Sequence, residues 1–455
     1  MFNLKEIQEA TVAKLIKGNL NVKLKGISID TRTIKRGDLF IAIKGARFDG
    51  HDFVEEAKRR GAKAVIISSL RDQFKSLKDI NILMVPDTVY ALGEIAKFYR
   101  SRFNPCIIAV TGTNGKTTAK DMIATILAKR FRVLKSQENQ NNQIGLSLTL
   151  LRLNKDYKFV VVELGTNHPG EIKRLTEISS PQIGLITNIG PGHLEFFHNL
   201  KNVFKEKFQL FKSLIYPAIC IYNGDDEILN SRCKFLARAI SFGMKNESHF
   251  RARNILQKEG IIKFAINNRY QVCLNTLGLF NVYNSLAAIS CARILGIENR
   301  IIKRFLGEFS FPKGRLQVLK NKSYTIIDDS YNSNPLSLEL AIKSLAKFRK
   351  KRKILVMADM LELGKDEVNI HESFSKMIHK SGIDILITMG RFSSKTAHKA
   401  IEEGMDKVFI CNYNDEVLEL LNALMRRGDI VLLKGSHAMH LEEVVLGLVN
   451  TLKKK

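Results

Sequence analysis

Short apolar runs rich in β-branched residues alternate with longer amphipathic stretches through the middle of this chain. Four such runs, IIAV, FVVVEL, IGLITNI and AICIYN, each lead into a loop. Runs of this kind are typical of buried strands, and their alternation with helical patterns predicts a mostly parallel, doubly wound α/β sheet. Such sheets bind their ligands beyond the carboxyl ends of the strands. Functional residues are therefore expected directly after the apolar runs.

The regions on either side show the same α/β character. In the first region the pattern predicts a strand ending at Asp30, a strand and turn in GDLFIAIKG, a helix near Phe53 to Arg60 and a strand in AVIIS. The opening stretch MFNLKEIQEATVAKLIKG has the pattern of a charged amphipathic helix. In the last region YTIIDDS, KILVMAD, ILITMG and DIVLLKG predict a second sheet, of the dinucleotide-fold type.

The chain is longer than a single hydrophobic core normally supports. At 455 residues two or three domains are expected, and the pattern of elements favours three. We predict a small α/β domain at residues 1–100, a central domain at 101–312 and a C-terminal domain at 313–455. The segment from Arg100 to Pro105 is the predicted linker between the first two.

A phosphate-binding loop follows the first apolar run of the central region. The stretch IIAVTGTNGKTTAKDMIATIL at 107–127 predicts a strand, a glycine-rich loop and a helix. Glycines let backbone N–H groups close around phosphate oxygens, the helix N-terminus adds its positive dipole end, and Lys116 brings a charge to the outer phosphates. Thr117 would hold Mg²⁺. The predicted nucleoside triphosphate site comprises Gly112, Thr113, Asn114, Gly115, Lys116, Thr117 and Thr118.

This loop is a shortened variant of the usual formula, and its alternative is a plain turn. The formula places a glycine five positions before the Gly-Lys pair, where this chain has Val110. A glycine-rich turn without a ligand would also connect a strand to a helix. The strand and the helix around the loop make the phosphate site the favoured interpretation.

Two later apolar runs end in residues suited to metal binding. FVVVEL ends near Glu163, and LITNIGPG leads into His193. A carboxylate at the end of a buried strand, in the same domain as a phosphate loop, is a natural Mg²⁺ ligand, and a histidine near phosphates suits a second metal. Taken alone, either residue is more often a solvated loop residue. Together with Lys116 they predict one site.

Composition adds a strong positive charge but no nucleic-acid motif. Lys and Arg number 72 against 45 Asp and Glu, a formal net charge of +27. Such a balance invites a nucleic-acid or membrane-surface function. The basic residues are dispersed over the whole length, however, and no basic helix with interleaved aromatic residues is present. A general positive field favours anionic substrates such as nucleotides.

The cysteines and the hydropathy pattern predict a soluble cytoplasmic enzyme. No CxxC or Cys/His spacing occurs, so structural zinc is not expected and reduced thiols are. No apolar run approaches the roughly 20 residues that a membrane helix needs, and the N-terminus lacks the apolar core of a signal peptide. The six cysteines are Cys106, Cys220, Cys233, Cys273, Cys291 and Cys411.

The order of motifs along the chain resembles the Mur ligase family. The resemblance spans nearly the whole chain, and the first domain contributes IDTRTIKRGDLFIAIKGARFDGHDF. Within the family it is similar to the branch that joins D-alanyl-D-alanine to a UDP-linked tripeptide, to which YNSNP and DMLELG point. The motifs, in order, are GTNGKTT, NNQIG, ELGTNHPGEI, TNIGPGHLEFF, IIDDSYNSNP, DMLELG and KGS.

The resemblance implies an ATP- and Mg²⁺-dependent amide ligase of peptidoglycan precursor synthesis. ATP would phosphorylate the terminal carboxylate of UDP-N-acetylmuramoyl-tripeptide, and the amine of D-alanyl-D-alanine would attack the acyl phosphate. It further implies a UDP-substrate-binding first domain, a central ATP-binding domain and a C-terminal ligase domain that closes over the ATP. We expect a monomer without nucleic-acid partners or stable membrane insertion.

Roles near the phosphates follow from the same resemblance. Thr117 and Glu163 resemble the ligands of one Mg²⁺, and His193 a ligand of a second. Lys207, fourteen positions after His193, resembles the lysine that reacts with CO₂ to become an anionic carbamate ligand, although spacing alone does not exclude Lys205. The alternative is an ordinary lysine on a charged helix from Lys201 to Lys212. Catalytic roles are implied for Lys116, His193, Lys207 and Arg315, the last reaching the γ-phosphate on closure.

Roles at the two ends of the substrates are also implied. Asn281 resembles an adenine-side asparagine, and Asp329 and Tyr331 a nucleotide-facing pair. SYNSNP is also a good turn sequence on any protein, and DTR and IKG in the first domain are equally compatible with surface turns. The implied substrate-binding positions are Asp30, Thr31, Arg32, Lys44, Gly45, Asn142, Asn332, Asn334 and Lys434.

The chain departs from the family pattern at four positions. Glutamate is frequent where Gln209 stands, histidine at Phe280, glycine at Ala358 and arginine at His437. A catalytically impaired relative is therefore one alternative. Another Mur-type or folylpolyglutamate-type ligase is a second, and a basic nucleotide-dependent binding protein acting on nucleic acid is a third.

Overall fold

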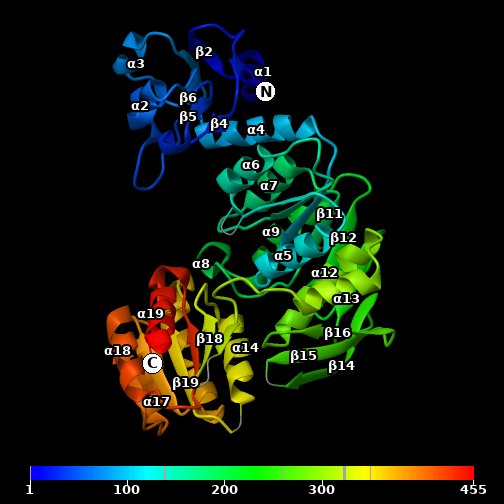
Figure 1. The fold of residues 1–455 in the computed structure, drawn as a ribbon, viewed down its shortest axis with the longest axis vertical. Coiled ribbons are helices and arrows are strands. Elements are labelled where there is room, and N and C mark those ends of the chain that lie inside the picture. The colour runs from blue at the N-terminus through cyan, green and yellow to red at the C-terminus, as the bar shows by residue number, and fades with distance from the viewer. Residues whose placement is uncertain (1, 138–139, 259, 321–323, 349, 455) are drawn as a thin grey trace.

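The computed structural model describes residues 2–137, 140–258, 260–320, 324–348 and 350–454. Three main sheets follow one another along the chain, each flanked by helices, as Figure 1 shows from blue through green to red. The predicted three-domain α/β fold is confirmed. The exact boundaries at residues 100 and 312 stay a prediction. Within the described residues, no helix is both long and apolar enough to cross a membrane.

The first domain is built on a sheet of order β2-β7-β6-β5-β4, in which only the edge strand β2 is antiparallel. Strands β5 and β6 are fully apolar and buried because helices cover the sheet. The strands are β1 Phe2–Asn3, β2 Lys14–Lys17, β3 Lys23–Leu24, β4 Ile27–Ser28, β5 Leu39–Ile41, β6 Ala64–Ile67 and β7 Asn81–Met84. The helices are α1 Leu4–Thr11, α2 Val54–Arg59, α3 Asp72–Ser76 and α4 Thr88–Ser101, with 3₁₀ turns at Thr31–Thr33 and Gly50–Phe53.

The middle sheet has the order β16-β15-β14-β13-β12-β11-β8-β10-β9. Strands β8 to β14 pair in parallel, and β14, β15 and β16 form an antiparallel extension. The strands are β8 Cys106–Thr111, β9 Val133–Lys135, β10 Phe159–Glu163, β11 Ile183–Ile186, β12 Ile219–Asn223, β13 Ala239–Gly243, β14 Phe250–Lys258, β15 Ile261–Ile266 and β16 Tyr270–Leu274. The helices are α5 Lys116–Leu127, α6 Gln143–Leu150, α7 Glu171–Ser179, α8 Leu194–Phe197, α9 Leu200–Lys207, α10 Gln209–Lys212, α11 Glu227–Cys233, α12 Phe280–Ile294 and α13 Asn299–Gly307.

The C-terminal sheet has the order β17-β18-β22-β19-β20-β21, with only β17 antiparallel. Its carboxyl edge faces the middle domain, and α8 lies at the boundary (Figure 1). The strands are β17 Gln317–Lys320, β18 Thr325–Asp329, β19 Lys353–Ala358, β20 Ile385–Met389, β21 Val408–Cys411 and β22 Ile430–Lys434. The helices are α14 Pro335–Ala346, α15 Glu367–Glu372, α16 Ser375–Lys380, α17 Ser393–Glu402, α18 Asn414–Leu424 and α19 Leu441–Lys454, with 3₁₀ turns at Gly364–Asp366 and His437–Met439.

Two predicted helices are divided in the structure. The opening helix ends at Thr11 because Val12 takes a left-handed conformation, and the rest of the predicted stretch forms the edge strand β2. The charged helix expected around Lys201 to Lys212 is two helices, α9 and α10. In the first case the strand pairs with β7, so tertiary hydrogen bonding overrides the local helical pattern.

Helix α7 is anchored at its N-terminus by a buried carboxylate from α9. The Glu206 carboxylate accepts the backbone N–H of Gly170 and that of Ile172, each at 2.8 Å. These N–H groups have no partner within the helix, and the negative charge also complements the helix dipole. Glu206 thereby ties the helix that carries Lys207 to the helix that follows strand β10.

We expect Glu206→Ala to lower the free energy of unfolding by about 1–3 kcal/mol, because it leaves buried N–H groups without acceptors. Denaturant unfolding followed by circular dichroism measures the change. Glu227→Gln removes an exposed carboxylate in the first turn of α11 and serves as the matched control, with a much smaller effect expected. Equal stability of Glu206→Ala and the wild type would contradict the anchoring role.

Candidate active site

The phosphate loop joins β8 to α5 at the carboxyl edge of the middle sheet. Gly112 has a φ of +145°, and a Cβ there would lie 1.9 Å from the Thr187 hydroxyl oxygen, so glycine is required. The Asn114 N–H donates to the side-chain oxygen of Asn188 at 3.0 Å, and the Asn188 amide donates to the Asn114 carbonyl at 2.9 Å. The Lys116 ammonium donates to two carbonyl oxygens of its own loop at 3.0 and 3.1 Å. The loop is therefore shaped before any ligand binds.

The two residues predicted to hold one Mg²⁺ meet beside this loop. The Thr117 hydroxyl donates to Glu163 Oε2 at 2.7 Å, and the Asn141 amide donates to Oε1 at 3.1 Å. The Glu163 backbone N–H donates to the Ser136 hydroxyl at 3.1 Å, and the buried Lys120 ammonium donates to the Ser136 carbonyl at 2.9 Å. Glu163 itself is 2% exposed. Its carboxylate is thus fixed at the strand end, facing the loop.

Lys207 is a buried lysine at the end of α9. It is 4% exposed, whereas Lys205 is an exposed residue. Burial, reinforced by the nearby Lys116 ammonium, lowers the pKa of Lys207 to about 7. Burial also lowers the pKa of Lys116. Of the two lysines that spacing left open, Lys207 has the environment that favours a neutral, nucleophilic amine at neutral pH.

The C-terminal domain contributes an ion pair and a stacked cluster. Asp329 and Lys434 are register partners at the ends of β18 and β22, and the Lys434 ammonium donates to Asp329 Oδ2 at 2.6 Å. Burial raises the pKa of Asp329, against the opposing effect of Lys434. The Arg315 guanidinium lies 4.1 Å from the centre of the Tyr331 ring, and the His437 ring stacks on Tyr331 at 5.4 Å. His437, one of the departures from the family pattern, therefore packs against a predicted nucleotide-facing residue.

Side chains of the C-terminal domain reach the phosphate loop and the predicted metal ligands. The Arg315 guanidinium donates to the Thr117 hydroxyl at 3.0 Å. The side-chain amides of Asn114 and Asn334 donate to each other's oxygens, at 3.3 and 2.8 Å. These contacts join residues far apart in sequence, so they depend on how the two domains dock.

The predicted metal ligand His193 also faces the C-terminal domain. Its Nδ1 lies 2.6 Å from Glu362 Oε2, and the pair is partly exposed. This contact holds the pKa of the Glu362 carboxyl below its usual range, with a smaller contribution from His168. A second residue of the C-terminal domain therefore approaches a predicted metal ligand.

A cavity of about 1040 Å³ lies between the two domains and collects most of the predicted residues. This volume is at the upper end for small-molecule sites. Its lining combines the loop, strand ends of the middle sheet and the region around β18. The predicted residues that line it are Thr113, Asn114, Gly115, Lys116, Thr117, Thr118, Asn142, Glu163, His193, Arg315, Asp329, Tyr331, Asn332, Asn334 and Lys434.

Models of one protein family match all three domains. Residues 110–292 match the Mur ligase middle domain, 314–437 the Mur ligase glutamate ligase domain, and 23–100 the Mur ligase family catalytic domain. The chain belongs to the Mur ligase family. The resemblance found in the sequence is therefore confirmed.

Individual Mur ligases are similar to the chain over nearly its whole length. UDP-N-acetylmuramoyl-tripeptide--D-alanyl-D-alanine ligase of Buchnera aphidicola is 37% identical over 437 residues, covering 94% of this chain and 93% of its own. The crystal structure of MurF from Acinetobacter baumannii has a TM-score of 0.89 at 28% identity, with 99% of each chain covered. MurF of Thermotoga maritima in complex with ADP has a TM-score of 0.84 at 27% identity, covering 94% of this chain and 98% of that one.

Asn281 is buried behind the wall of the cavity. It is 1% exposed, and its amide donates to the Thr276 hydroxyl and the Leu277 carbonyl, both at 3.0 Å. Its side-chain oxygen accepts the Asn284 amide at 3.0 Å, and Asn284 lines the cavity. Asn281 is not among the residues that line the cavity, and it orients Asn284 from behind. The predicted contact of Asn281 with a base stays a prediction.

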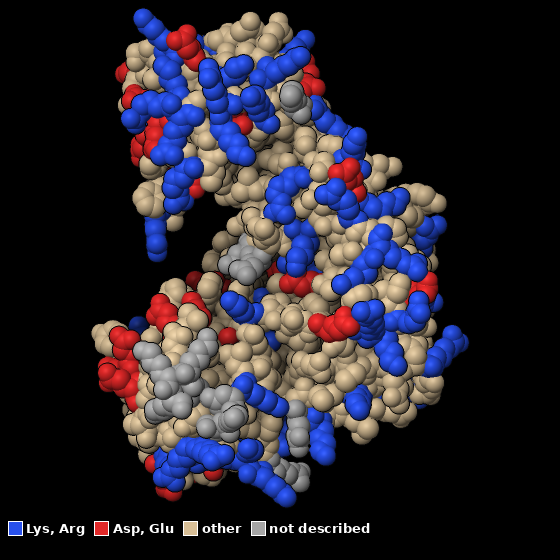
Figure 2. Space-filling view, viewed as in Figure 1, with Lys and Arg blue, Asp and Glu red and all other residues tan. Residues whose placement is uncertain are grey.

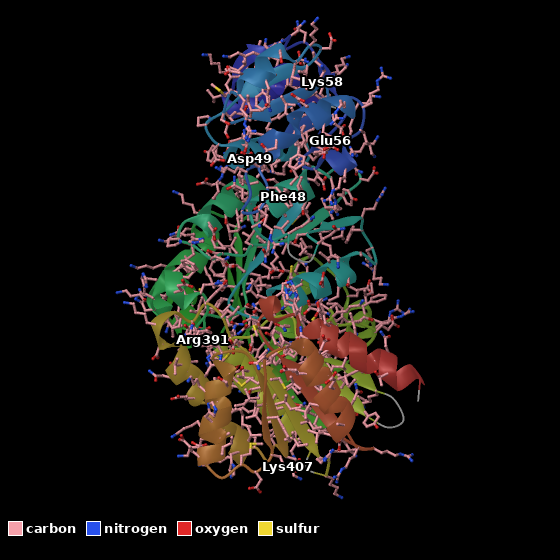
Figure 3. All side chains as sticks on the ribbon, turned by 90° about the vertical axis from the view of Figure 1, so that its left-hand side faces the viewer. Phe48, Asp49, Glu56, Lys58, Arg391 and Lys407 are labelled. Carbon is pink, nitrogen blue, oxygen red and sulfur yellow. The ribbon has the colours of Figure 1, made fainter. Side chains whose placement is uncertain are left out.

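The first-domain residues lie away from the cavity. Asp30 caps the turn at Thr31–Thr33, and its carboxylate binds the Arg32 guanidinium at 2.6 Å on the surface. Lys44 and Gly45 belong to the loop that ends near Phe48 and Asp49, which Figure 3 labels at the lower end of the first domain. Among the first-domain residues that the structure describes, none lines the cavity. These predicted UDP contacts stay a prediction.

The oxygen atoms of Thr117 and Glu163 suit a hard cation such as Mg²⁺ that binds together with a nucleotide. Within the described parts of the chain, no three His, Cys, Asp or Glu side chains are close enough to form a metal site by themselves. Mg²⁺ usually binds through one or two carboxylates together with phosphate oxygens and waters. The Thr117 hydroxyl and the Glu163 carboxylate, held together beside the phosphate loop, offer that incomplete set.

Two residues that shape the site were missed from the sequence. Asn284 lines the cavity and Glu362 contacts His193. Glu362 lies inside a quoted motif, DMLELG, so a signal existed without a role attached to it. Asn284 follows Asn281 by about one helical turn, and only the orientation of α12 decides which one faces the cavity.

We expect Lys207→Met to be more stable than the wild type at pH 6, with the difference shrinking as the pH rises from 7 towards 10. The Lys207 pKa is about 7 in the folded state against 10.5 ordinarily. Below pH 7 the folded wild type therefore carries a buried charge. Above it only the unfolded chain binds the proton, so wild-type stability rises with pH.

Thermal unfolding in CO₂-free buffers measures this difference. Lys205→Met, which removes an exposed lysine two positions away, is the matched control and should give a difference from the wild type that is independent of pH. A pH-independent difference for Lys207→Met as well would contradict the lowered pKa.

Proposed function

We propose that this Mur ligase joins D-alanyl-D-alanine to UDP-N-acetylmuramoyl-tripeptide with hydrolysis of ATP, as a monomer in the cytoplasm. The observation that carries the proposal is the cavity in which the phosphate loop, Glu163 and Arg315 of the two domains converge. The UDP-N-acetylmuramoyl-tripeptide--D-alanyl-D-alanine ligase of Buchnera aphidicola, 37% identical, supports the choice of substrates. The ADP complex of Thermotoga maritima MurF supports the nucleotide.

The reaction has two steps in which the atoms balance. In the first, a carboxylate oxygen of the tripeptide attacks the γ-phosphorus of ATP, forming an acyl phosphate and releasing ADP. In the second, the neutral amine of D-alanyl-D-alanine attacks the acyl carbon, and the tetrahedral intermediate expels phosphate as the amide forms and the amine loses a proton. No covalent bond to the protein is needed. Catalysis then depends on positioning and on the neutralisation of phosphate charge.

The protein residues have distinct parts in this scheme. The backbone of the loop and the Lys116 ammonium hold the outer phosphates, and Arg315 brings a second cation from the C-terminal domain to the same place. Asn284 lines the cavity as a further polar group, behind which Asn281 is fixed. Lys434 holds Asp329 at the strand end, where Tyr331 and Arg315 form a flat surface next to the cavity.

Metal binding is assigned to residues beside the phosphates. Thr117 and Glu163 would hold one Mg²⁺, and His193 with Lys207, once carbamylated, a second. When bound, Mg²⁺ would neutralise phosphate charge next to these residues. The lowered pKa of Lys207 supports the carbamate, because only a neutral amine reacts with CO₂.

The UDP end of the substrate is assigned to the first domain. Asp30, Thr31, Arg32, Lys44 and Gly45 would bind the uracil and the diphosphate, and Asn142, Asn332 and Asn334 the peptide end. The Arg32 side chain is 83% exposed and is available to an anionic ligand. The separation of this group from the cavity suits a substrate in which a nucleotide and a peptide lie at opposite ends.

The alternatives are weaker on specific grounds. Figure 2 shows Lys and Arg spread over this face of all three domains, where a nucleic-acid protein would present a concentrated stripe. A folylpolyglutamate-type ligase shares the ATP core, but the similarity to UDP-N-acetylmuramoyl-tripeptide--D-alanyl-D-alanine ligases extends through the first domain. An impaired relative would be expected to lack groups at the phosphates, and Lys116, Thr117, Glu163 and Arg315 are all present.

We expect purified protein to release phosphate only when Mg²⁺-ATP, UDP-N-acetylmuramoyl-tripeptide and D-alanyl-D-alanine are all present. Phosphate release is followed with each substrate omitted in turn, and the mass of the product is recorded. Lys116→Ala should lower kcat at least 10²-fold, because it removes a cation that stabilises transferring phosphate.

The outcomes separate the candidate functions. Turnover that does not depend on the dipeptide would keep the ATP site but require another acceptor, for which amino acids and folates form the test panel. Absence of turnover with every acceptor would favour the impaired relative or the binding protein, and salt-sensitive binding to DNA or RNA would identify the latter.

A further inference from the structure

The imidazole of His193 is approached by a carboxylate from the other domain. His193 Nδ1 lies 2.6 Å from Glu362 Oε2. Nδ1 is buried, and Glu362 is the carboxylate that faces it at this distance, although the angles of the contact do not yet meet those of a hydrogen bond. His193 also lines the cavity, and Nε2 has no hydrogen bond to any residue that the structure describes. Nδ1 therefore faces the Glu362 carboxylate, and Nε2 remains available to bind a metal ion.

The backbone that carries each of the two side chains is held in place by contacts within its own domain. His193 is left-handed, with a φ of 53°, and its carbonyl accepts the N–H groups of Phe196 and Phe197 at the start of α8. Glu362 is also left-handed, with a φ of 62°. Its neighbours are tied down, since the Leu361 N–H donates to the Ser436 hydroxyl at 2.9 Å and Leu363 is buried in the core.

This arrangement is the one by which proteins tune a metal-binding histidine. A histidine that ligates a metal through one nitrogen commonly gives its other N–H to a carboxylate, which sets the tautomer, orients the ring and raises its basicity. Usually the carboxylate belongs to the same rigid unit as the histidine. Here it belongs to the domain that carries Arg315 and Asn334 to the phosphate loop.

We propose that Glu362 is a positioning residue for the second metal ion of the proposed function, and that it makes metal binding at His193 depend on docking of the C-terminal domain. Glu362 acts through His193 and does not itself contact substrate. When the domains are apart, His193 has no carboxylate partner and is a weaker ligand. When they dock, the ligand is oriented at the same time as Arg315 arrives at the phosphates.

The coupling must act in both directions. If docking strengthens metal binding at His193, then metal binding must favour docking by the same factor, because the two are linked equilibria. Removal of a carboxylate that supports a metal-binding histidine typically weakens metal affinity 10- to 100-fold. The proposal therefore predicts a matched change in two separate measurements.

Titration of the full-length protein with Mn²⁺ in the presence of β,γ-imido-ATP tests this. Electron paramagnetic resonance counts the bound ions, and small-angle X-ray scattering reports domain docking through the radius of gyration. We expect Glu362→Gln to weaken one Mn²⁺ site about 10-fold or more and to leave the other unchanged. The Mn²⁺ concentration needed for compaction should rise by a similar factor.

Matched variants separate this effect from general damage. Glu367→Gln removes a carboxylate five positions away that has no hydrogen bond or ion pair to a described residue, and it should behave like the wild type. His193→Gln should lose the same Mn²⁺ site, and adding Glu362→Gln to it should change the remaining site no further.

Two results would overturn the inference. Unchanged affinities and compaction in Glu362→Gln would show that the carboxylate does not support His193. Weakening of both Mn²⁺ sites, also in the His193→Gln background, would show that it acts elsewhere. If the wild type bound only one Mn²⁺, the second metal of the proposed function would fail as well, whereas nucleotide-dependent turnover would be unaffected.

Discussion

A surplus of positive charge in a buried place is the constraint on which this site depends. Lys116, Lys207 and Arg315 gather around the end of the middle sheet, together with the buried carboxylates of Glu163 and Glu206. Charges withdrawn from water are costly unless they are compensated. The chain offsets the cost by lowering the pKa of both lysines and by turning the Lys116 ammonium onto carbonyl oxygens of its own loop. A triphosphate would replace those weak partners with strong ones.

The docking of the C-terminal domain follows from the same constraint. Arg315 adds a further cation and rests on the Thr117 hydroxyl, while Asn334 pairs with Asn114 in the loop. The partners in these interdomain contacts are therefore neutral hydroxyl and amide groups. Each of these interdomain bonds is modest, since a neutral hydrogen bond contributes about 0.5–1.5 kcal/mol net. Such contacts orient the domain over the loop and still allow it to move when a ligand enters.

The parts of this site that lie within one short segment could be predicted from the sequence. The parts that depend on contacts between distant segments could not. The phosphate loop was predicted because glycines, a lysine and a threonine in one short segment have a chemical meaning before the chain folds. The parallel sheets were predicted from apolar runs, and Glu163 from its place at the end of one run. The contact between His193 and Glu362 joins two domains, and nothing local to either residue marks it. Asn281 was predicted from a motif, whereas the packing of α12 brings Asn284 to the cavity, which the motif alone did not indicate. The left-handed Val12 and the pairing of β2 with β7 likewise lie beyond a local pattern.

The distance between the first domain and the cavity is itself informative about the substrate. A site for a small acid and ATP would need only the middle and C-terminal domains, since those two line the cavity by themselves. The first domain is nevertheless fixed to the middle one by charged and aromatic contacts: the Arg174 guanidinium lies 3.9 Å from the Tyr90 ring centre and pairs with Glu94 at 2.6 Å. Arg174 also lines the cavity, so a helix that borders the cavity also contacts the first domain. A ligand that binds to the first domain and to the cavity at once must have the right length as well as the right functional groups. This requirement would let one ATP-binding core select among acceptors that share a terminal carboxylate.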